Sequence, residues 1–191
     1  DTPGHVDFSY EVSRSLQACE GALLVVDASQ GIQAQTLANV YLALEQDLKI
    51  IPVLNKIDLP ASDVERVSAE VISLLGCSED EIIKISAKTG QGVEEVLERI
   101  VSDVPPPKGI ESNDTRALIF DSYYDEYRGV ILYVRVVDGK IEKNNEIRMV
   151  AAGANGIALD VGHLSPDMSS DKSINTGEIG FIVTNLKSTQ Q

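Results

Sequence analysis

The sequence predicts an α/β domain with a mostly parallel sheet, followed by a small antiparallel β-barrel. In residues 1–104, short apolar runs alternate with segments whose apolar residues recur at helical spacing, the pattern of strands and helices that build a parallel sheet. The proline-rich stretch "VPPPKGIESND" at 104–114 then interrupts both patterns. Beyond it the chain consists of short β-type segments separated by Gly, Asn, Asp and Ser, which is typical of a small barrel.

The elements of the first domain follow from the spacing of their apolar residues. The run "GALLVVDA" has the length and continuous apolar character of a strand buried on both faces. The segment "QTLANVYLAL" instead places Leu37, Val40, Tyr41 and Leu44 along one side of a helix. By the same criteria, strands are expected at 21–28, 49–55 and 81–86, and helices at 35–44, 64–74 and 93–101.

Three consecutive prolines make the segment after the last helix a stiff, exposed linker. The predicted organisation is therefore a first domain over 1–104, a linker over 105–115 and a barrel domain over 116–191. Asp138-Gly139 predicts a tight hairpin turn. Strands of the barrel are expected at 116–124, 129–139, 145–151, 156–165 and 177–186.

The composition excludes several function classes. The net charge is −14, and residues 1–104 carry 18 Asp or Glu against 7 Lys or Arg. Broad charge-driven binding to RNA or an anionic membrane is disfavoured by this balance, and no DNA partner is expected. Cys19 and Cys77 lie apart without a CxxC pattern, so we expect reduced thiols and no zinc site. No apolar run approaches the roughly 20 residues of a membrane-spanning helix.

The cluster "NKID" at 55–58 directly follows a predicted buried strand, and ligands of open parallel sheets bind beyond such strand ends. Guanine presents N1–H and N2–H₂ as adjacent donors, which the Asp58 carboxylate can accept as a bidentate pair. Asn55 can bond the N7 edge of the purine and tie neighbouring loops together. The aliphatic stem of Lys56 can lie over the plane of the base.

The cluster "SAK" at 86–88 follows the third predicted strand and strengthens the prediction of a guanine pocket. The backbone N–H of Ala87 can donate to guanine O6, where adenine instead presents an amino donor. Lys88 can pack on the opposite face of the base, and Ser86 can brace the loop.

The opening residues "DTPGH" suit the phosphate end of the same nucleotide. Asp1 can hold a water bound to Mg²⁺, and the Gly4 N–H can meet a γ-phosphate oxygen without obstruction by a side chain. His5 can orient the attacking water for in-line displacement, in which positioning and charge stabilisation provide most of the catalysis. The candidate nucleotide is therefore GTP or GDP with Mg²⁺.

The three clusters, in this order, resemble the last three of the five signatures of regulatory GTPases. "DTPGHVDFSYEVSRSL", "AKTGQGVEEVLERIV" and "ALIFDSYYDEYRGVILYVRV" are similar to the LepA (elongation factor 4) family of translational GTPases, and the similarity covers essentially the whole chain. Elongation factor G and the TypA/BipA group are the alternative relatives. One departure is Asn144-Asn145, where family members usually have Gly-Asp, and Asn tolerates the positive φ of such a turn.

The resemblance implies a partial P-loop GTPase domain followed by domain II of a translation factor. It also implies GTP hydrolysis, the ribosome with its rRNA and tRNA as partner, an effect on tRNA position or translocation, and a cytoplasmic location. Loose peripheral membrane association occurs among such relatives.

The sequence contains no GxxxxGK[ST] phosphate loop. We therefore expect an internal fragment that lacks the first strands and the first switch. Alone it should be inactive, bind nucleotide weakly or not at all, and be able to self-associate through uncovered sheet edges. A non-catalytic folding or binding module is the alternative reading of this stretch.

The segment "DSYYDEYRG" at 121–129 places three tyrosines beside Arg128. Two interpretations remain open: contact with rRNA through stacking, or packing at the rim of the barrel.

Overall fold

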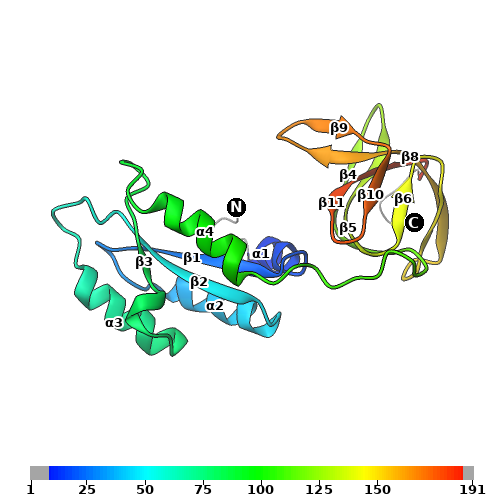
Figure 1. The fold of residues 1–191 in the computed structure, drawn as a ribbon. Coiled ribbons are helices and arrows are strands. Elements are labelled where there is room, and N and C mark those ends of the chain that lie inside the picture. Colours follow the sequence, from blue (N-terminus) through cyan, green and yellow to red (C-terminus); the bar gives the residue numbers. More distant parts are fainter. Residues whose placement is uncertain (1–8, 187–191) are drawn as a thin grey trace. The chain divides into compact units, whose positions relative to one another are not determined.

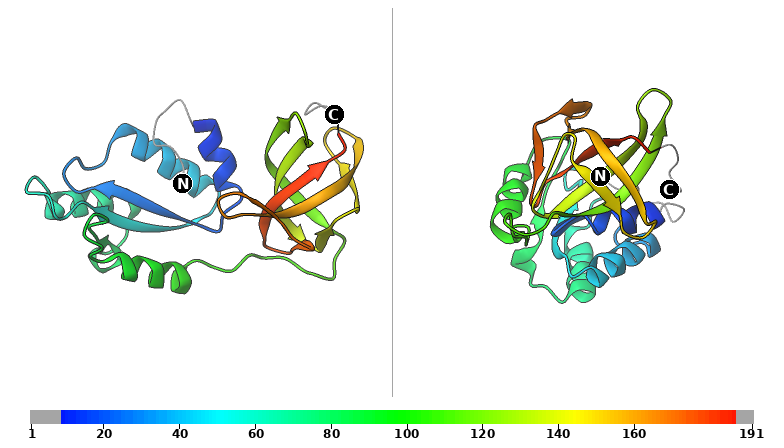
Figure 2. Two further views of the ribbon diagram at one scale, coloured as in Figure 1. Left: turned by 90° about the horizontal axis from the view of Figure 1, so that it is seen from above. Right: turned by 90° about the vertical axis from the view of Figure 1, so that its right-hand side faces the viewer.

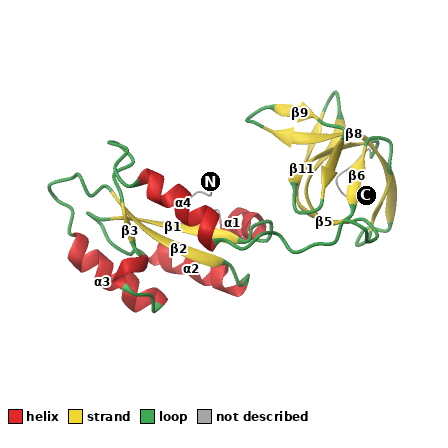
Figure 3. Cartoon of the chain, viewed as in Figure 1, coloured by secondary structure: helices red, strands yellow, loops and turns green. Residues whose placement is uncertain are grey.

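The computed structural model describes residues 9–186, which fall into two compact units divided between Pro106 and Pro107. The first unit contains helices packed on a parallel sheet, and the second contains antiparallel strands (Figures 1 and 3). The predicted fold class is confirmed. No helix within residues 9–186 combines the length and the apolar character needed to cross a membrane.

The parallel sheet of the first unit has the order β1-β2-β3. β1 pairs with β2 in a register that places Asp27 beside Asn55 at their carboxyl ends. The third strand is much shorter than the predicted 81–86, because Glu79–Glu81 form a 3₁₀ helix just before it. The strands are β1 (Gly21–Asp27), β2 (Lys49–Asn55) and β3 (Ile83–Lys84).

Helices cover both faces of this sheet (Figure 1). Val67 and Val71 of α3 pack with Leu54 on one face, whereas Val96 of α4 packs with Val53 on the other. The short helix α1 packs against α2 through Val12, Leu16 and Ala43. The helices are α1 (Ser9–Leu16), α2 (Ala34–Glu45), α3 (Val64–Leu75) and α4 (Val93–Asp103).

Local signals explain where α3 begins and ends. The Asp63 carboxylate accepts a hydrogen bond from the Arg66 N–H at 3.1 Å, which satisfies one of the free donors at the helix start. Gly76 ends the helix in the left-handed conformation, with φ of +67°.

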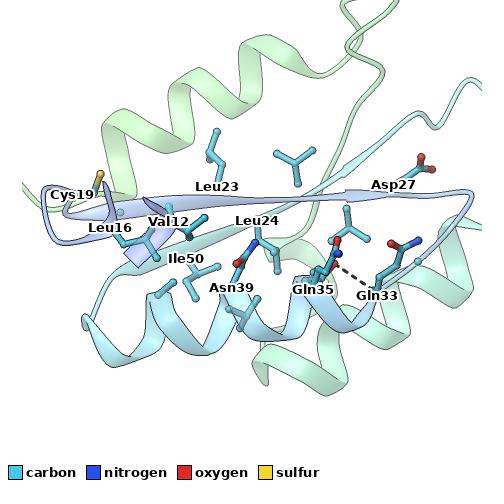
Figure 4. A pocket seen from close by; sticks show the side chains of 18 of the residues that line it. Val12, Leu16, Cys19, Leu23, Leu24, Asp27, Gln33, Gln35, Asn39 and Ile50 are labelled. Atoms are coloured by element: carbon cyan, nitrogen blue, oxygen red, sulfur yellow. Dashed lines mark hydrogen bonds between the residues drawn. The ribbon is translucent and has the colours of Figure 1, made fainter. Parts of the chain in front are cut away.

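The prediction that the first strand is buried on both faces is wrong. Leu23 and Val25 are 41% and 54% exposed, although Val26 on the opposite face is buried. The physical reason is that α4 covers β2, whereas on the same face of the sheet no described helix packs over β1. An open groove of about 630 Å³ is lined by residues of α1, β1 and α2, and Figure 4 shows Leu23 and Leu24 on opposite sides of β1.

The second unit is a curled antiparallel sheet of order β4-β5-β11-β8-β7, with β9 paired to β8 (Figure 2). Its core contains Val134, Val136 and Ile182. A separate ribbon pairs β10 with β6. The strands are β4 (Arg116–Asp125), β5 (Gly129–Asp138), β6 (Lys140–Glu142), β7 (Glu146–Met149), β8 (Ala154–Leu164), β9 (Met168–Ser170), β10 (Ser173–Asn175) and β11 (Ile179–Thr184).

Asp138-Gly139 does not close the predicted hairpin, because β6 pairs with β10 rather than with β5. The Asp138 side chain is instead buried, where it accepts the Ile110 N–H at 2.9 Å and the Arg116 guanidinium at 2.5 and 2.8 Å. These bonds hold the carboxyl pKa of Asp138 below its usual value, chiefly through Ile110. The turn at Asn144 does have the positive φ, +69°, that Asn tolerates.

Candidate functional site

The candidate site lies at the carboxyl ends of the three parallel strands, where open α/β sheets bind their ligands. Asp27 ends β1, Asn55 ends β2, and the loop 86–88 follows β3. Polar side chains of three strands therefore meet along one edge of the sheet.

Asn55 joins the two loops that were predicted to form the base pocket. Its Oδ1 accepts the backbone N–H of Lys56 at 2.7 Å and that of Ala87 at 3.0 Å. A backbone bond from the Ile57 N–H to the Ile85 carbonyl, 3.2 Å long, joins the same segments. The segments 55–58 and 86–88, distant in sequence, are thus held side by side.

Ser86 braces the second loop from inside. It is fully buried, and its Oγ accepts the Thr89 N–H at 3.2 Å. Its backbone N–H donates to the Gln91 carbonyl at 3.0 Å, and its carbonyl accepts the Gly90 N–H at 2.9 Å. These bonds close a compact turn that leaves Ala87 and Lys88 exposed.

The two groups predicted to recognise the base differ in whether they already have a hydrogen-bond partner. The Asp58 carboxylate is exposed and has no hydrogen-bond or ion-pair partner among residues 9–186. The Ala87 N–H, in contrast, already donates to Asn55. Donation to guanine O6 therefore requires the Asn55 side chain to release or share that N–H.

Lys56 adopts an uncommon backbone conformation and a fixed side-chain direction. Its φ is +67°, in the left-handed region that residues other than glycine rarely occupy. Its Nζ lies 2.6 Å from the Asp27 Oδ2, so the ammonium is anchored on the neighbouring strand.

The sequence analysis did not identify Asp27 as a site residue. A usable signal was present, because Asp27 is an acidic residue at the end of a predicted strand, as Asn55 is a polar residue at the end of the next one. The other oxygen of Asp27, Oδ1, accepts the Ser29 N–H at 2.8 Å and the Ser29 hydroxyl at 2.6 Å. The hydrogen bond from Lys56, followed by that from Ser29, lowers the pKa of Asp27 to about 2. Asp27 is therefore ionised across the physiological pH range.

The predicted phosphate and metal ligands Asp1, Gly4 and His5 lie outside the described residues. Within residues 9–186, no group of three or more His, Cys, Asp or Glu side chains could hold a metal ion.

In the second unit, the tyrosines of "DSYYDEYRG" have different environments. Tyr123 packs against Tyr133 with ring centroids 5.7 Å apart, as rim packing predicts. Tyr127 is 96% exposed at a turn in which the Asp125 carboxylate accepts the N–H groups of Tyr127 and Arg128, each at 2.8 Å. Rim packing therefore accounts for Tyr123, whereas Tyr124 and Tyr127 are exposed, at 57% and 96%.

Comparison with known proteins agrees with this arrangement. Residues 1–106 match the family model of the elongation factor Tu GTP binding domain. The whole chain is 57% identical to elongation factor 4 of Cutibacterium acnes and 58% identical to that of Thermobifida fusca. The chain spans 31% of the length of these relatives. The resemblance drawn from the sequence is thus confirmed.

Solved structures support the fold. Translation elongation factor SelB from Methanococcus maripaludis in complex with the GTP analogue GppNHp has a TM-score of 0.80 over the whole chain at 22% identity, covering 43% of SelB. The apo form of SelB has a TM-score of 0.77 over 92% of the chain at 19% identity, and the match covers 38% of SelB. Because the family model matches more than half of the sequence, the chain belongs to the elongation factor Tu GTP-binding domain family.

Proposed function

We propose that this chain supplies the guanine-recognition side of a translational GTPase. The observation that carries the proposal is the bond between Asn55 and Ala87, which holds the two base-reading loops together while the Asp58 carboxylate has no partner in the described residues. An unpaired carboxylate on a braced loop is a pre-positioned acceptor for two adjacent N–H donors.

Guanine recognition follows from these groups. Asp58 accepts the N1–H and N2–H₂ donors, and the Ala87 N–H turns from Asn55 to guanine O6. Asn55 donates an Nδ2 N–H to N7, and its Oδ1 keeps the Lys56 N–H. The stems of Lys56 and Lys88 enclose the two faces of the base.

For the whole protein we propose GTP hydrolysis on the ribosome. Asp1 would hold a Mg²⁺-bound water, Gly4 would bind the γ-phosphate, and His5 would orient the attacking water. The similarity to curated elongation factor 4 supports a role in tRNA position during translocation, with the ribosome as partner and the cytoplasm as location. Residues 1–191 alone are proposed to be inactive, because their sequence holds no phosphate loop.

A second candidate role concerns association of the chain with itself. Leu23 and Val25 are exposed on β1, which lies at the edge of the described sheet. Exposed apolar edge strands are templates for pairing with another chain. This property favours a binding module that assembles through β1.

The proposed base pocket is tested by Asp58→Asn. The matching segment of elongation factor 4 from Thermobifida fusca is replaced by this chain, and nucleotide competition is measured with and without the substitution. Loss of a charge-assisted bidentate pair should weaken GTP binding by about 10- to 100-fold. Xanthosine triphosphate, which presents a carbonyl where guanine has an amino group, should bind better than before.

Asp114→Asn is the matched control, since it removes an exposed carboxylate in the linker. It should leave both affinities unchanged. Unchanged GTP preference in Asp58→Asn, or equal competition by ATP in the unaltered chimera, would refute the assigned pocket.

A further inference from the structure

The ion pair between Asp27 and Lys56 connects β1 to the base-reading loop. Lys56 Nζ lies 2.6 Å from the Asp27 carboxylate, and within residues 9–186 that ammonium has no other hydrogen-bond partner. Asp27 belongs to none of the three sequence clusters. Its side chain is 18% exposed, whereas that of Lys56 is 51% exposed, so the carboxylate is the better-fixed partner.

We propose that Asp27 is a positioning residue, which anchors the Lys56 ammonium so that the lysine stem forms one wall of the guanine pocket. The inference rests on the proposed function, because it assigns a residue to the same pocket.

The Asp27 carboxylate is itself held in place by Ser29, in the turn that follows β1. Oδ1 accepts two hydrogen bonds from Ser29, one from its N–H at 2.8 Å and one from its hydroxyl at 2.6 Å. Oδ2 is thereby left pointing to Lys56. One oxygen fixes the rotamer of Asp27, and the other fixes the lysine.

The backbone of Lys56 directs its side chain toward this anchor. The residue has φ of +67°, and its N–H donates to Asn55 Oδ1 at 2.7 Å. A lysine side chain has many rotamers, and this freedom is lost in part when its stem packs on a ligand. An ammonium already bound to Asp27 has lost part of that freedom before the base arrives.

Charge supports the same role. The Asp27 carboxylate neutralises the Lys56 ammonium, so the stem can be desolvated against the base at lower cost than with an unpaired charge. A free lysine would instead extend into solvent.

The competing explanation is a surface ion pair that only joins two strand ends. Such a pair contributes little to folding stability and has no effect on ligand affinity beyond that of stability. Base affinity and thermal stability therefore distinguish the two explanations.

The experiment measures GDP affinity by titration of the chimera in which this chain replaces the matching segment of elongation factor 4 from Thermobifida fusca. Asp27→Asn should weaken GDP binding by about three- to tenfold, the effect of releasing one rotamer-rich side chain. In a Lys56→Met background, Asp27→Asn should have no further effect on affinity. Ser29→Ala, which loosens the same carboxylate, should give a smaller loss in the same direction.

Asp160→Asn is the matched control. Asp160 accepts the Ser170 hydroxyl at 2.6 Å and lies 3.6 Å from Lys143 Nζ, so it holds a serine and a lysine as Asp27 does, but in the second unit. It should not change GDP affinity.

The outcomes separate the two proposals. If Asp27→Asn lowers the melting temperature but leaves GDP affinity unchanged, the positioning role is overturned and the base pocket stands. Equal affinity losses from Asp27→Asn with and without Lys56→Met would also overturn it, because Asp27 would then act independently of the lysine. If ATP competes as well as GDP for the unaltered chimera, the base pocket fails and this proposal fails with it.

Discussion

Asn55 shows how one side chain can both build a site and respond to its ligand. Its carbonyl oxygen accepts N–H groups from Lys56 and Ala87, so it closes the gap between two loops. In the proposed pocket, the Ala87 N–H donates to guanine O6 when the base is bound. Because the bond to the ligand replaces an internal bond of similar strength, the exchange costs little free energy.

The Asp27–Lys56 pair predicts a defined pH dependence of stability. The pKa of Asp27 is lowered from 3.8 to about 2, so the folded state favours the ionised form more than the unfolded state does. This contribution is fully present above the unfolded pKa and is lost as the pH falls through the folded value. Since Lys56 is half exposed, we expect about 1 kcal/mol from the pair at neutral pH.

The measurement is urea unfolding of the unaltered chain and Asp27→Asn between pH 3 and pH 7. Their difference in unfolding free energy should be constant above about pH 5 and should shrink below pH 4. A difference that grows on acidification would contradict the assigned pKa direction.

At the scale of secondary structure, the sequence analysis located best the elements that a short stretch of sequence is enough to identify. Helical spacing located α2, α3 and α4 closely, since each has its own amphipathic stripe and end signals. The strand at 81–86 was overestimated because an apolar run does not reveal that Ser78 and Glu81 cap a 3₁₀ turn. The short strands β6, β9 and β10 were missed, because three residues give too little periodicity.

The candidate site was predictable only in part. Asn55, Lys56, Asp58 and the loop 86–88 lie in contiguous motifs that can be read along the chain. Asp27 is brought to Lys56 by the parallel register of β1 and β2, across 29 positions. Contacts of this kind depend on tertiary structure, which no local pattern contains.

The start of α4 offers a test of how the helix shapes the loop 86–91. Gly92 has φ of +73°, and a Cβ there would lie 2.6 Å from the Lys84 carbonyl oxygen. Gly92→Ala should therefore combine backbone strain of about 1–2 kcal/mol with a displacement of the loop that carries Ala87. We expect a lower melting temperature and altered amide shifts at 86–88.

Gly90→Ala is the matched comparison, because Gly90 also has positive φ, +82°, but a Cβ there meets nothing within 4 Å. It should cost only the backbone strain. Equal effects of the two substitutions on the shifts at 86–88 would show that α4 does not position the loop.

For the whole molecule, charge is distributed unevenly along the chain. Residues 1–104 hold 18 acidic against 7 basic side chains, whereas residues 105–191 hold 12 against 9. Electrostatic repulsion of a polyanionic partner is therefore weaker in the second unit. There the exposed Tyr127 lies beside Arg128, a pair that offers stacking and a positive charge together.

The two units are predicted to unfold separately. Each hydrophobic cluster in residues 9–186 lies wholly within one unit, as with Val71 in the first and Phe181 in the second. The connecting prolines at 105–107 are exposed and make no regular structure. The structure divides the chain between Pro106 and Pro107, with separate hydrophobic clusters on each side of that point.

Differential scanning calorimetry of the full chain should resolve two transitions. Phe181 is 1% exposed, so Phe181→Ala should destabilise the second unit by about 3–5 kcal/mol and lower one transition only. Val71→Ala, at a fully buried position of α3, should lower only the other. If either substitution shifted both transitions equally, the units would unfold as one cooperative body, and the proposed division into domains would be wrong.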